Sequence, residues 1–267
     1  MSNVKIYCVT NKEINFIKKK NYFLSWVGKS NELPSNYIKC DDLDNIFYKE
    51  KYYSELTFHY WYWKNLLDKE DENSWIGFCQ KRRYWIKENL NNIKINKTNI
   101  NEFLLYKKGN DWDRYNSIIC NPITIKGAKK IKLIKKGWRN ILNNHKLLFG
   151  KDQENLMTHF DMHHGFGNLK KAISLLENDD RYEFLNYVNE NDKFNPHIMF
   201  ISKKSVAKKW FECLFSWLDR CEKEFGFKTL KGYETTRLYA YLAERYLSFW
   251  FKKYTKYKEQ GWIFIDV

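Results

Sequence analysis

Residues 53–85 read YSELTFHYWYWKNLLDKEDENSWIGFCQKRRYW, and this stretch decides the fold class. In its first part, apolar side chains recur at spacings of four, three and four residues, which places them on one helical face: Leu56, Tyr60, Trp63 and Leu67. After a polar turn, residues 75–79 form a short apolar run, as expected of a strand buried on both faces. A helix followed by such a strand predicts an α/β fold.

The predicted strand leads, after Gln80, into three cations, Lys81, Arg82 and Arg83. In an open α/β sheet, ligands bind beyond the carboxyl ends of the strands. A planar guanidinium group binds phosphate through two parallel hydrogen bonds. A buried strand that is followed by these cations therefore predicts an anionic ligand such as a diphosphate.

Two further apolar runs, residues 4–10 and 22–28, precede this stretch and read as strands. Gly28, at the end of the second run, would permit a tight turn or the close approach of a ligand. Residues 36–40 lead into an acidic loop, residues 41–45, just before the helix. The order strand, loop, helix, strand suits the nucleotide-binding half of an α/β protein.

The rest of the chain predicts helices that pack on the sheet. Amphipathic periodicity is clearest in residues 205–225 and 233–254. We therefore divide the chain into an α/β domain, residues 1–203, and a helical segment with a terminal strand, residues 204–267, packed as part of the same unit. The other expected elements are a strand in 116–125 interrupted by Pro122, a partly helical basic stretch in 131–148, a helix in 152–168 with Asp152 as N-cap and Gly165 or Gly167 at its end, helices in 168–176 and 181–188, a loop and strand in 193–202, and a strand in 261–267.

The 267-residue chain carries a formal charge of +15. This charge has two explanations: the codon bias of an AT-rich genome, or an anionic partner such as a nucleotide sugar, a membrane surface or nucleic acid. The six cysteines include no Cys-x-x-Cys pair, which favours a reducing cytoplasm and argues against a zinc site. We expect neither a signal peptide nor a membrane-spanning segment, because no apolar stretch reaches about 18 residues.

Several separated motifs between residues 5 and 250 resemble one protein family. They are Glu55-Leu56-Thr57, Tyr60-Trp61, Trp63-Lys64-Asn65, Arg82-Arg83-Tyr84 and Leu242-Ala243-Glu244-Arg245. Together they are similar to the large bacterial family of capsular and exopolysaccharide glycosyltransferases, long catalogued as a domain of unknown function. The chain departs from this pattern at Gln80-Lys81, where the family usually has a His-Tyr pair.

The resemblance implies a glycosyltransferase A-type fold, in which a Rossmann-like sheet binds a nucleotide sugar. It implies transfer of a sugar, from a UDP-activated donor, to a growing capsular polysaccharide or related surface glycan. The acceptor is expected to be lipid-linked, and the basic surface would hold the enzyme at the inner face of the plasma membrane. Among family counterparts, the nucleobase or ribose contacts are expected from Thr10, Gly28, Asp44, Asn45 and Lys64.

Many A-type glycosyltransferases neutralise the leaving diphosphate with Mn²⁺ or Mg²⁺ held by an Asp-x-Asp pair. At the expected place this chain has Lys81, Arg82 and Arg83, so we predict that arginine replaces the metal. The alternative is a structural cluster in which these arginines pair with Glu55 or Glu244. A Mn²⁺ or Mg²⁺ site in the acidic run 41–44 is the second possibility for a cofactor.

An acid–base candidate lies in the segment that holds Asp161, His163 and His164. Histidine titrates near neutral pH, and Asp161 lies three residues before His164, so the carboxylate would orient the imidazole on one helical face. The alternatives are phosphate binding or a helix end whose histidines suit the dipole. Asn195 and His197 are candidates for sugar contacts.

Trp85 and Trp112 stand in polar surroundings and are candidates for a stacking platform for the acceptor. His59 is expected to be a half-buried structural residue, and Glu244 and Arg245 are expected to form a buried ion pair that ties a late helix to the sheet. Two other functions remain open: a nucleic-acid-binding protein, which the charge and the aromatic content favour, and an inactive glycosyltransferase-like scaffold, which Gln80-Lys81 favours.

Overall fold

The computed structural model describes residues 4–87, 93–125 and 155–267. Within them the chain forms an eight-stranded mixed sheet and a separate two-stranded ribbon. The strands are β1 (Val4–Thr10), β2 (Tyr22–Trp26), β3 (Trp75–Gln80), β4 (Arg83–Trp85), β5 (Ser117–Cys120), β6 (Ile123–Thr124), β7 (Lys193–Phe194), β8 (Phe200–Lys203), β9 (Tyr257–Gln260) and β10 (Trp262–Phe264). The α-helices are α1 (Glu50–Tyr53), α2 (Leu56–Asn65), α3 (Ile100–Phe103), α5 (Leu156–His164), α6 (Asn168–Ser174), α7 (Asn178–Glu190), α8 (Lys204–Phe225), α9 (Tyr233–Thr236) and α10 (Leu238–Tyr254). Short 3₁₀ helices are η1 (Ser30–Glu32), η2 (Phe47–Lys49), η3 (Leu67–Lys69) and η4 (Trp112–Arg114).

Three strands of the sheet, β1, β2 and β3, are parallel, and the other strands join them in mixed directions. Strand β1 lies between β2 and β3 and is parallel to both, as predicted for a nucleotide-binding half. On the other side of β3, β8 runs antiparallel to both β3 and β5. The late strand β9 then pairs parallel to β5, and β10 pairs with β4. The predicted α/β fold is therefore confirmed, and the last strands of the chain belong to the same sheet as the first.

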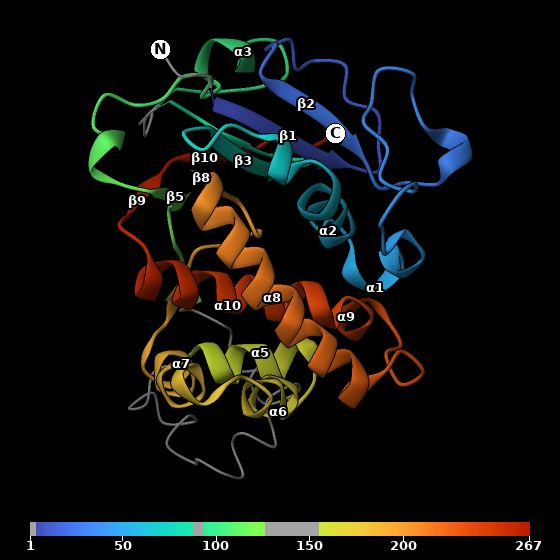
Figure 1. Ribbon diagram of the computed structural model, residues 1–267, viewed down its shortest axis with the longest axis vertical. Helices are drawn as coiled ribbons and strands as arrows, with labels where there is room; N and C mark the ends of the chain where they lie inside the picture. The colour runs from blue at the N-terminus through green and yellow to red at the C-terminus, as the bar shows by residue number, and fades with distance from the viewer. Residues whose placement is uncertain (1–3, 88–92, 126–154) are drawn as a thin grey trace.

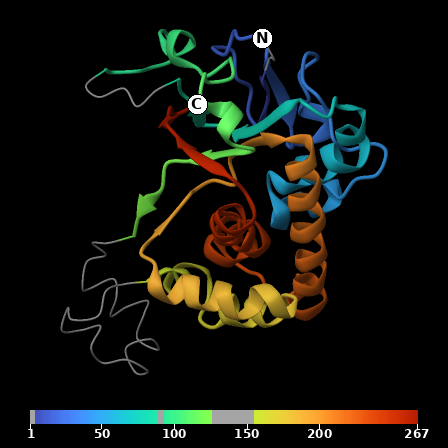
Figure 2. The ribbon, with the colours of Figure 1, turned by 60° about the vertical axis from the view of Figure 1, so that its left-hand side comes forward.

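Most of the helices lie in two tiers on one face of this sheet, and the short helix α3 lies on the opposite face (Figure 1). Helices α2, α8 and α10 pack next to the strands, and α5, α6 and α7 lie farther out. A turned view shows α10 enclosed between the sheet, α8 and the outer helices (Figure 2). This position explains the composition of α10, in which nearly every side chain from Leu238 to Phe251 is buried.

Alternation along the central strands builds a core on each face of the sheet. From β3, Ile76 and Phe78 face the helical tiers, where Phe78 packs against Phe200 and Phe211. Trp75 and Cys79 face the opposite side, which is covered by residues 100–112 and the loop before β2. The apolar run 75–79 was predicted to be a strand buried on both faces, and the structure confirms this because both faces of β3 are covered.

Three predicted elements differ in detail. The helix expected from Tyr53 begins at Leu56, because Ser54 takes a positive φ of 52° and separates α1 from α2. The helix expected over 233–254 is divided at Arg237 into α9 and α10. The helix expected in 152–168 begins at Leu156, with Asn155 as its N-cap, and ends at Gly165 with φ 98°. The predictions for Asp152 and for 131–148 lie outside the described residues.

We predict that the substitution Gly77→Ala destabilises the protein by about 1–3 kcal/mol, because it overpacks the centre of the sheet. A Cβ atom at this position would lie 2.7 Å from Cγ1 of Ile201 on the neighbouring strand. The free energy of unfolding is measured by urea denaturation. In the double variant with Ile201→Ala, the added methyl group enters the space left by the isoleucine. The double variant should therefore be destabilised by less than the sum of the two single-variant values. Fully additive costs would contradict this packing.

Candidate functional site

The three predicted cations lie on a tight hairpin between β3 and β4. Gln80 pairs with Arg83, so Lys81 and Arg82 form the tip of the turn. Arg82 has φ 72°, a conformation that suits glycine far better than arginine. The hairpin is held on both sides, because the Lys81 amide donates to Val9 O (2.9 Å) and Ile265 N donates to Arg82 O (2.8 Å). Strain of this kind persists only where surrounding structure enforces it.

The hairpin forms one wall of a cleft of about 270 Å³ at the carboxyl ends of β1 and β3. Four cations line this cleft: Lys81, Arg82, Arg83 and Arg237. The floor comes from the ends of β1 and β2, and the opposite wall from the segment that joins α1 to α2. The structure thus brings the three predicted cations together in a cleft at the predicted edge of the sheet.

The three hairpin cations have different anchors. The Lys81 ammonium group contacts the side-chain oxygen of Asn11. The Nε atom of Arg82 lies 2.9 Å from the Asp266 carboxylate, which is 74% exposed. The Nε–H group of Arg83 donates to Nε2 of His197 at 3.1 Å. Burial, followed by repulsion from Arg237 and Arg82, lowers the pKa of Lys81. A bound anion would relieve this repulsion.

The ion pairs do not support the alternative in which the hairpin arginines pair with Glu55 or Glu244. Within the described residues, Arg82 pairs with Asp266, and neither Arg82 nor Arg83 forms an ion pair with Glu55 or Glu244. Glu244 instead pairs with Arg245, whose Nη1 lies 2.7 Å from the Glu244 carboxylate.

Sequence reasoning missed three charged residues of the cleft as ligand contacts: Glu50, Glu55 and Arg237. Glu55 appeared only as part of a motif and as a possible structural partner of the arginines. Glu50 and Arg237 stand in polar segments with no pattern that marks them. They meet the hairpin because α1 packs against α10, and no local signal reports that contact.

His197 supports the hairpin from behind. Its Nε2 accepts from Arg83, its backbone N–H donates to Glu244 at 2.7 Å, and its ring contacts Trp262 edge to face. Its φ is 74°, and Gln80 Nε2 donates to its carbonyl oxygen at 2.9 Å. Desolvation lowers the pKa of His197 to about 4, which leaves the imidazole neutral and able to accept from Arg83. A sugar contact from His197 stays a prediction.

The Glu244–Arg245 pair confirms the expected buried ion pair. Arg245 is 1% exposed and stacks on the Phe194 ring, 3.7 Å from its centroid, so it joins α10 to β7 of the two-stranded ribbon. His59 is 1% exposed, with its ring against Phe78. It is therefore a core residue, more deeply buried than expected.

Three sequence-predicted ligand contacts are wrong because the side chains have no exposed surface. Trp85 and Trp112 are both 0% exposed; Trp85 donates to the backbone of Phe78, and Trp112 packs on Trp75. Asn195 is likewise 0% exposed and donates to Cys120 O at 2.6 Å. Polar neighbours in sequence suggested exposure for the two tryptophans, but tertiary packing covers them.

Asp161, His163 and His164 lie at the end of α5 and do not line the cleft. The Asp161 carboxylate accepts from the backbone N–H of Gly167 at 3.0 Å. The His164 ring stacks on Tyr241, with centroids 3.7 Å apart, and its Nδ1 lies 3.1 Å from Glu234 O. Desolvation lowers the pKa of His164 to about 4. The catalytic role of these three residues stays a prediction.

Of the predicted nucleotide contacts, Thr10 lines the cleft, and its hydroxyl closes a turn with Lys12. Gly28, Asp44, Asn45 and Lys64 do not line it. Gly28 accommodates the Trp26 indole, because a Cβ atom there would lie 2.5 Å from that ring.

The acidic run 41–44 is used to fasten its loop to α2. Asp42 accepts from Trp61 Nε1 at 3.0 Å, and Asp44 accepts from the Tyr60 hydroxyl at 3.2 Å. In the part of the chain that the structure describes, no group of three or more His, Cys, Asp or Glu side chains is arranged to hold a metal ion.

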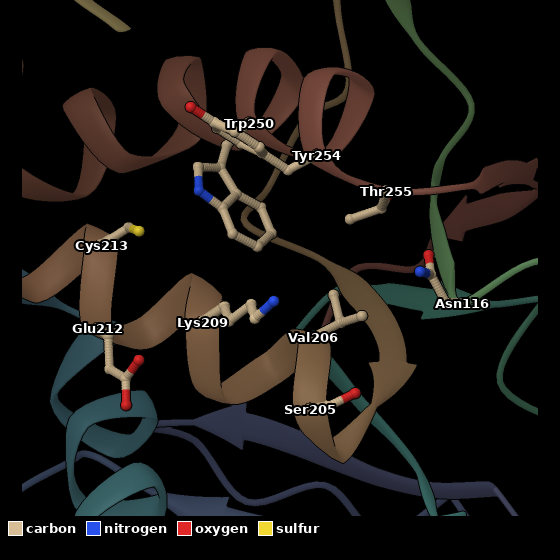
Figure 3. A pocket seen from close by; sticks show the side chains of 9 residues that line it. All are labelled: Asn116, Ser205, Val206, Lys209, Glu212, Cys213, Trp250, Tyr254 and Thr255. Atoms are coloured by element: carbon tan, nitrogen blue, oxygen red, sulfur yellow. The ribbon is translucent and has the colours of Figure 1, made fainter. Parts of the chain in front are cut away.

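A second pocket, of about 470 Å³, lies between α8 and α10 (Figure 3). Trp250 and Tyr254 reach toward it from α10, and Lys209 and Cys213 lie across from them on α8. It sits near the end of β8 that pairs with the start of β3, so it is at the opposite edge of the sheet from the hairpin. No sequence-predicted site residue lines it.

Comparison with known proteins adds a family and a fold. A family model described as a domain of unknown function, DUF4422, matches residues 5–256. A solved structure described as the apo form of the bifunctional glycosyltransferase WbbM superposes with a TM-score of 0.71 at 18% sequence identity. The match covers 99% of this chain and 45% of that one, so the chain spans less than half of the length of the bifunctional protein. No curated protein gives a significant match. The chain thus shares the fold of part of that glycosyltransferase, which agrees with the predicted A type.

We predict that the free energy of unfolding falls as the pH is lowered from 6.5 toward 4. The folded protein lowers the pKa of His197 and His164 to about 4, whereas an unfolded histidine titrates near 6.5. Between these values the unfolded state binds more protons, so acid favours unfolding. Urea unfolding at pH 7, 6 and 5 measures the effect.

Between pH 6.5 and 5, the free energy of unfolding should fall by about 2 kcal/mol less in His197→Gln than in the wild type. The reason is that each pKa unit corresponds to about 1.4 kcal/mol. The exposed Tyr48→Phe serves as a control with an unchanged pH dependence. An identical slope in His197→Gln and the wild type would contradict a neutral, buried His197.

Proposed function

The chain belongs to the DUF4422 family, and we propose that it is a glycosyltransferase that transfers a sugar from a nucleotide-sugar donor, with UDP as the first nucleotide to test. The observation that carries the proposal is the convergence of four cations on a cleft at the carboxyl edge of the sheet. That edge is where open α/β proteins bind nucleotides. The shared fold with a bifunctional glycosyltransferase supports the same chemistry.

The charges of the cleft suit a leaving nucleoside diphosphate. Transfer of the sugar breaks the bond between its anomeric carbon and the diphosphate, and negative charge develops on the departing oxygen. Lys81, Arg82, Arg83 and Arg237 would stabilise this charge. Because the hairpin is already held in a strained conformation, little reorganisation would be needed during the reaction.

The size of the cleft limits which part of the donor it holds. Its volume of about 270 Å³ is just below the range of about 300–1,000 Å³ typical of small-molecule pockets. We therefore place the diphosphate and the reacting end of the sugar in the cleft. The nucleoside would extend outward past Val27, at the end of β2, beyond the enclosed volume.

We further propose that the cations take the place of a divalent metal ion, with a Mn²⁺- or Mg²⁺-dependent enzyme as the alternative. A guanidinium group neutralises phosphate charge without the carboxylate ligands that a hard cation requires. The acidic run 41–44 is a weak candidate for the alternative, since Asp42 and Asp44 are engaged with α2.

The acceptor that we propose is a growing capsular or related surface glycan, linked to lipid at the inner face of the membrane. The sequence motifs and the charge of +15 support this assignment, since a basic surface is attracted to anionic lipid. No helix in the described ranges has the length and apolar character needed to cross a membrane.

A thermal-shift panel of UDP-, GDP-, CMP- and dTDP-sugars tests the donor. We expect one nucleotide class to raise the melting temperature, because a ligand that binds only the folded state stabilises it. If no nucleotide sugar or free nucleoside diphosphate gives a shift, the proposed function is wrong.

Loss of one phosphate-binding arginine should weaken nucleotide binding without loss of folding. We expect Arg83→Ala and Arg82→Ala each to raise the Kd about 10- to 150-fold, which corresponds to about 1.5–3 kcal/mol for a hydrogen bond to a charged group. Calorimetric titration measures binding, and Arg220→Ala on α8 is the control. Wild-type affinity in both cleft variants would contradict this site.

Chelation distinguishes the two modes of charge neutralisation. We expect donor consumption to continue in EDTA, because side chains supply the positive charge. Complete loss of activity that Mn²⁺ restores would overturn the metal-independent mechanism and favour the alternative.

A further inference from the structure

The cleft contains two carboxylates that diphosphate binding does not explain. Glu50 and Glu55 line it together with the four cations. A carboxylate beside a diphosphate is repulsive, so these groups weaken donor binding unless they serve another purpose. Glycosyl transfer has such a need, since the acceptor hydroxyl must lose a proton.

The backbone places both carboxylates on one wall. Glu50 is the first residue of α1, and Glu55 immediately precedes α2. Ser54, between the two helices, has φ 52° and ψ −129° and also lines the cleft. A serine in this conformation costs on the order of 1–3 kcal/mol. The chain therefore accepts backbone strain between the two glutamates that line the cleft.

Neither carboxylate has a direct hydrogen-bond or ion-pair partner among the described side chains. Among the described residues, no side chain forms an ion pair or a hydrogen bond with the carboxylate of Glu50 or Glu55. Nearby acids differ: Glu222 pairs with Lys49, and Asp266 pairs with Arg82. Arg237 also lies in the cleft without an ion-pair partner within the described ranges. Such unpaired charges in a shared cleft are available to a ligand.

We propose that Glu50 is the general base that removes the proton from the acceptor hydroxyl group, with Glu55 beside it in the acceptor site. The assignment rests on the proposed glycosyl transfer. Glu50 is the first choice of the two cleft carboxylates because burial raises the pKa of Glu50 and Glu55 raises it further, while Arg237 and Lys81 oppose both effects. A carboxylate with a raised pKa is the stronger base.

The step balances as a direct displacement. The acceptor oxygen forms a bond to the anomeric carbon of the donor sugar as its proton passes to the Glu50 carboxylate. The bond between that carbon and the diphosphate oxygen breaks, and its electron pair leaves with the nucleoside diphosphate, which the four cations stabilise. Glu50 then returns the proton to solvent. Attack opposite the leaving group inverts the anomeric configuration.

The test compares Glu50→Gln with Glu55→Gln and with the surface control Glu32→Gln. The donor is the nucleotide sugar that stabilises the wild type most in the thermal-shift panel, and a lipid extract of the cells that make the protein supplies the acceptor. Release of nucleoside diphosphate gives kcat, calorimetry gives the Kd for the nucleoside diphosphate, and NMR of the product gives the anomeric configuration. Circular dichroism verifies that each variant is folded.

We expect Glu50→Gln to lower kcat about 10²- to 10⁴-fold while the Kd stays within about threefold, since the base acts in the chemical step. Glu55→Gln should lower kcat less, and the product should be inverted. The kcat of the wild type should rise with pH as Glu50 loses its proton, and this rise should be absent in Glu50→Gln.

Three results would overturn the assignment of Glu50 as the base but not the proposed function. They are a near-wild-type kcat in Glu50→Gln, a larger loss of kcat in Glu55→Gln than in Glu50→Gln, or a product with retained configuration. Each requires an active wild type, so each leaves the proposed function intact. A wild type that neither binds nor consumes any nucleotide sugar overturns the proposed function itself, and the base assignment falls with it.

Discussion

The hairpin between β3 and β4 is the constraint on which the candidate site depends. Two hydrogen bonds hold its tip, one to the end of β1 and one from the segment that follows β10. Between them, Arg82 is kept in a left-handed conformation that an isolated chain would avoid. The same geometry directs Lys81, Arg82 and Arg83 into a single cleft. The positions of these cations therefore depend on the strands that hold the hairpin from both sides.

Support for the hairpin comes from the far end of the chain. Glu244 on α10 accepts from the backbone of His197, and His197 accepts from Arg83. His197 itself has a positive φ, as does Arg82, the neighbour of the arginine that donates to it. Burial keeps the imidazole neutral, which preserves its acceptor nitrogen for the guanidinium group. The late helix therefore orients a cation that lies more than 150 residues earlier in the chain.

The cleft combines charges of both signs, and the proposed reaction has a task for each. Cations suit a leaving group that gains negative charge, and carboxylates suit an acceptor that gives up a proton. Their proximity also has an electrostatic benefit, because Arg237 and Lys81 stabilise the ionised form of Glu50 that a base requires. This division of roles is consistent with a glycosyltransferase fold and needs neither the Asp161 segment nor the second pocket.

The sequence by itself determined the local elements and predicted an anionic ligand. The apolar runs marked β1, β2 and β3, and the cations after β3 indicated an anion at that edge, because periodicity and neighbouring residues report backbone preference and charge directly. It also indicated the Glu244–Arg245 pair, through two opposite charges within an apolar helix. Only the tertiary structure decided that Glu50, Glu55 and Arg237 complete the cleft, and that Trp85, Trp112 and Asn195 are buried away from any ligand. The physical reason is that burial and convergence arise from packing between distant segments, here α1 against α10 and residues 100–112 against the sheet, and a local pattern carries no record of such contacts.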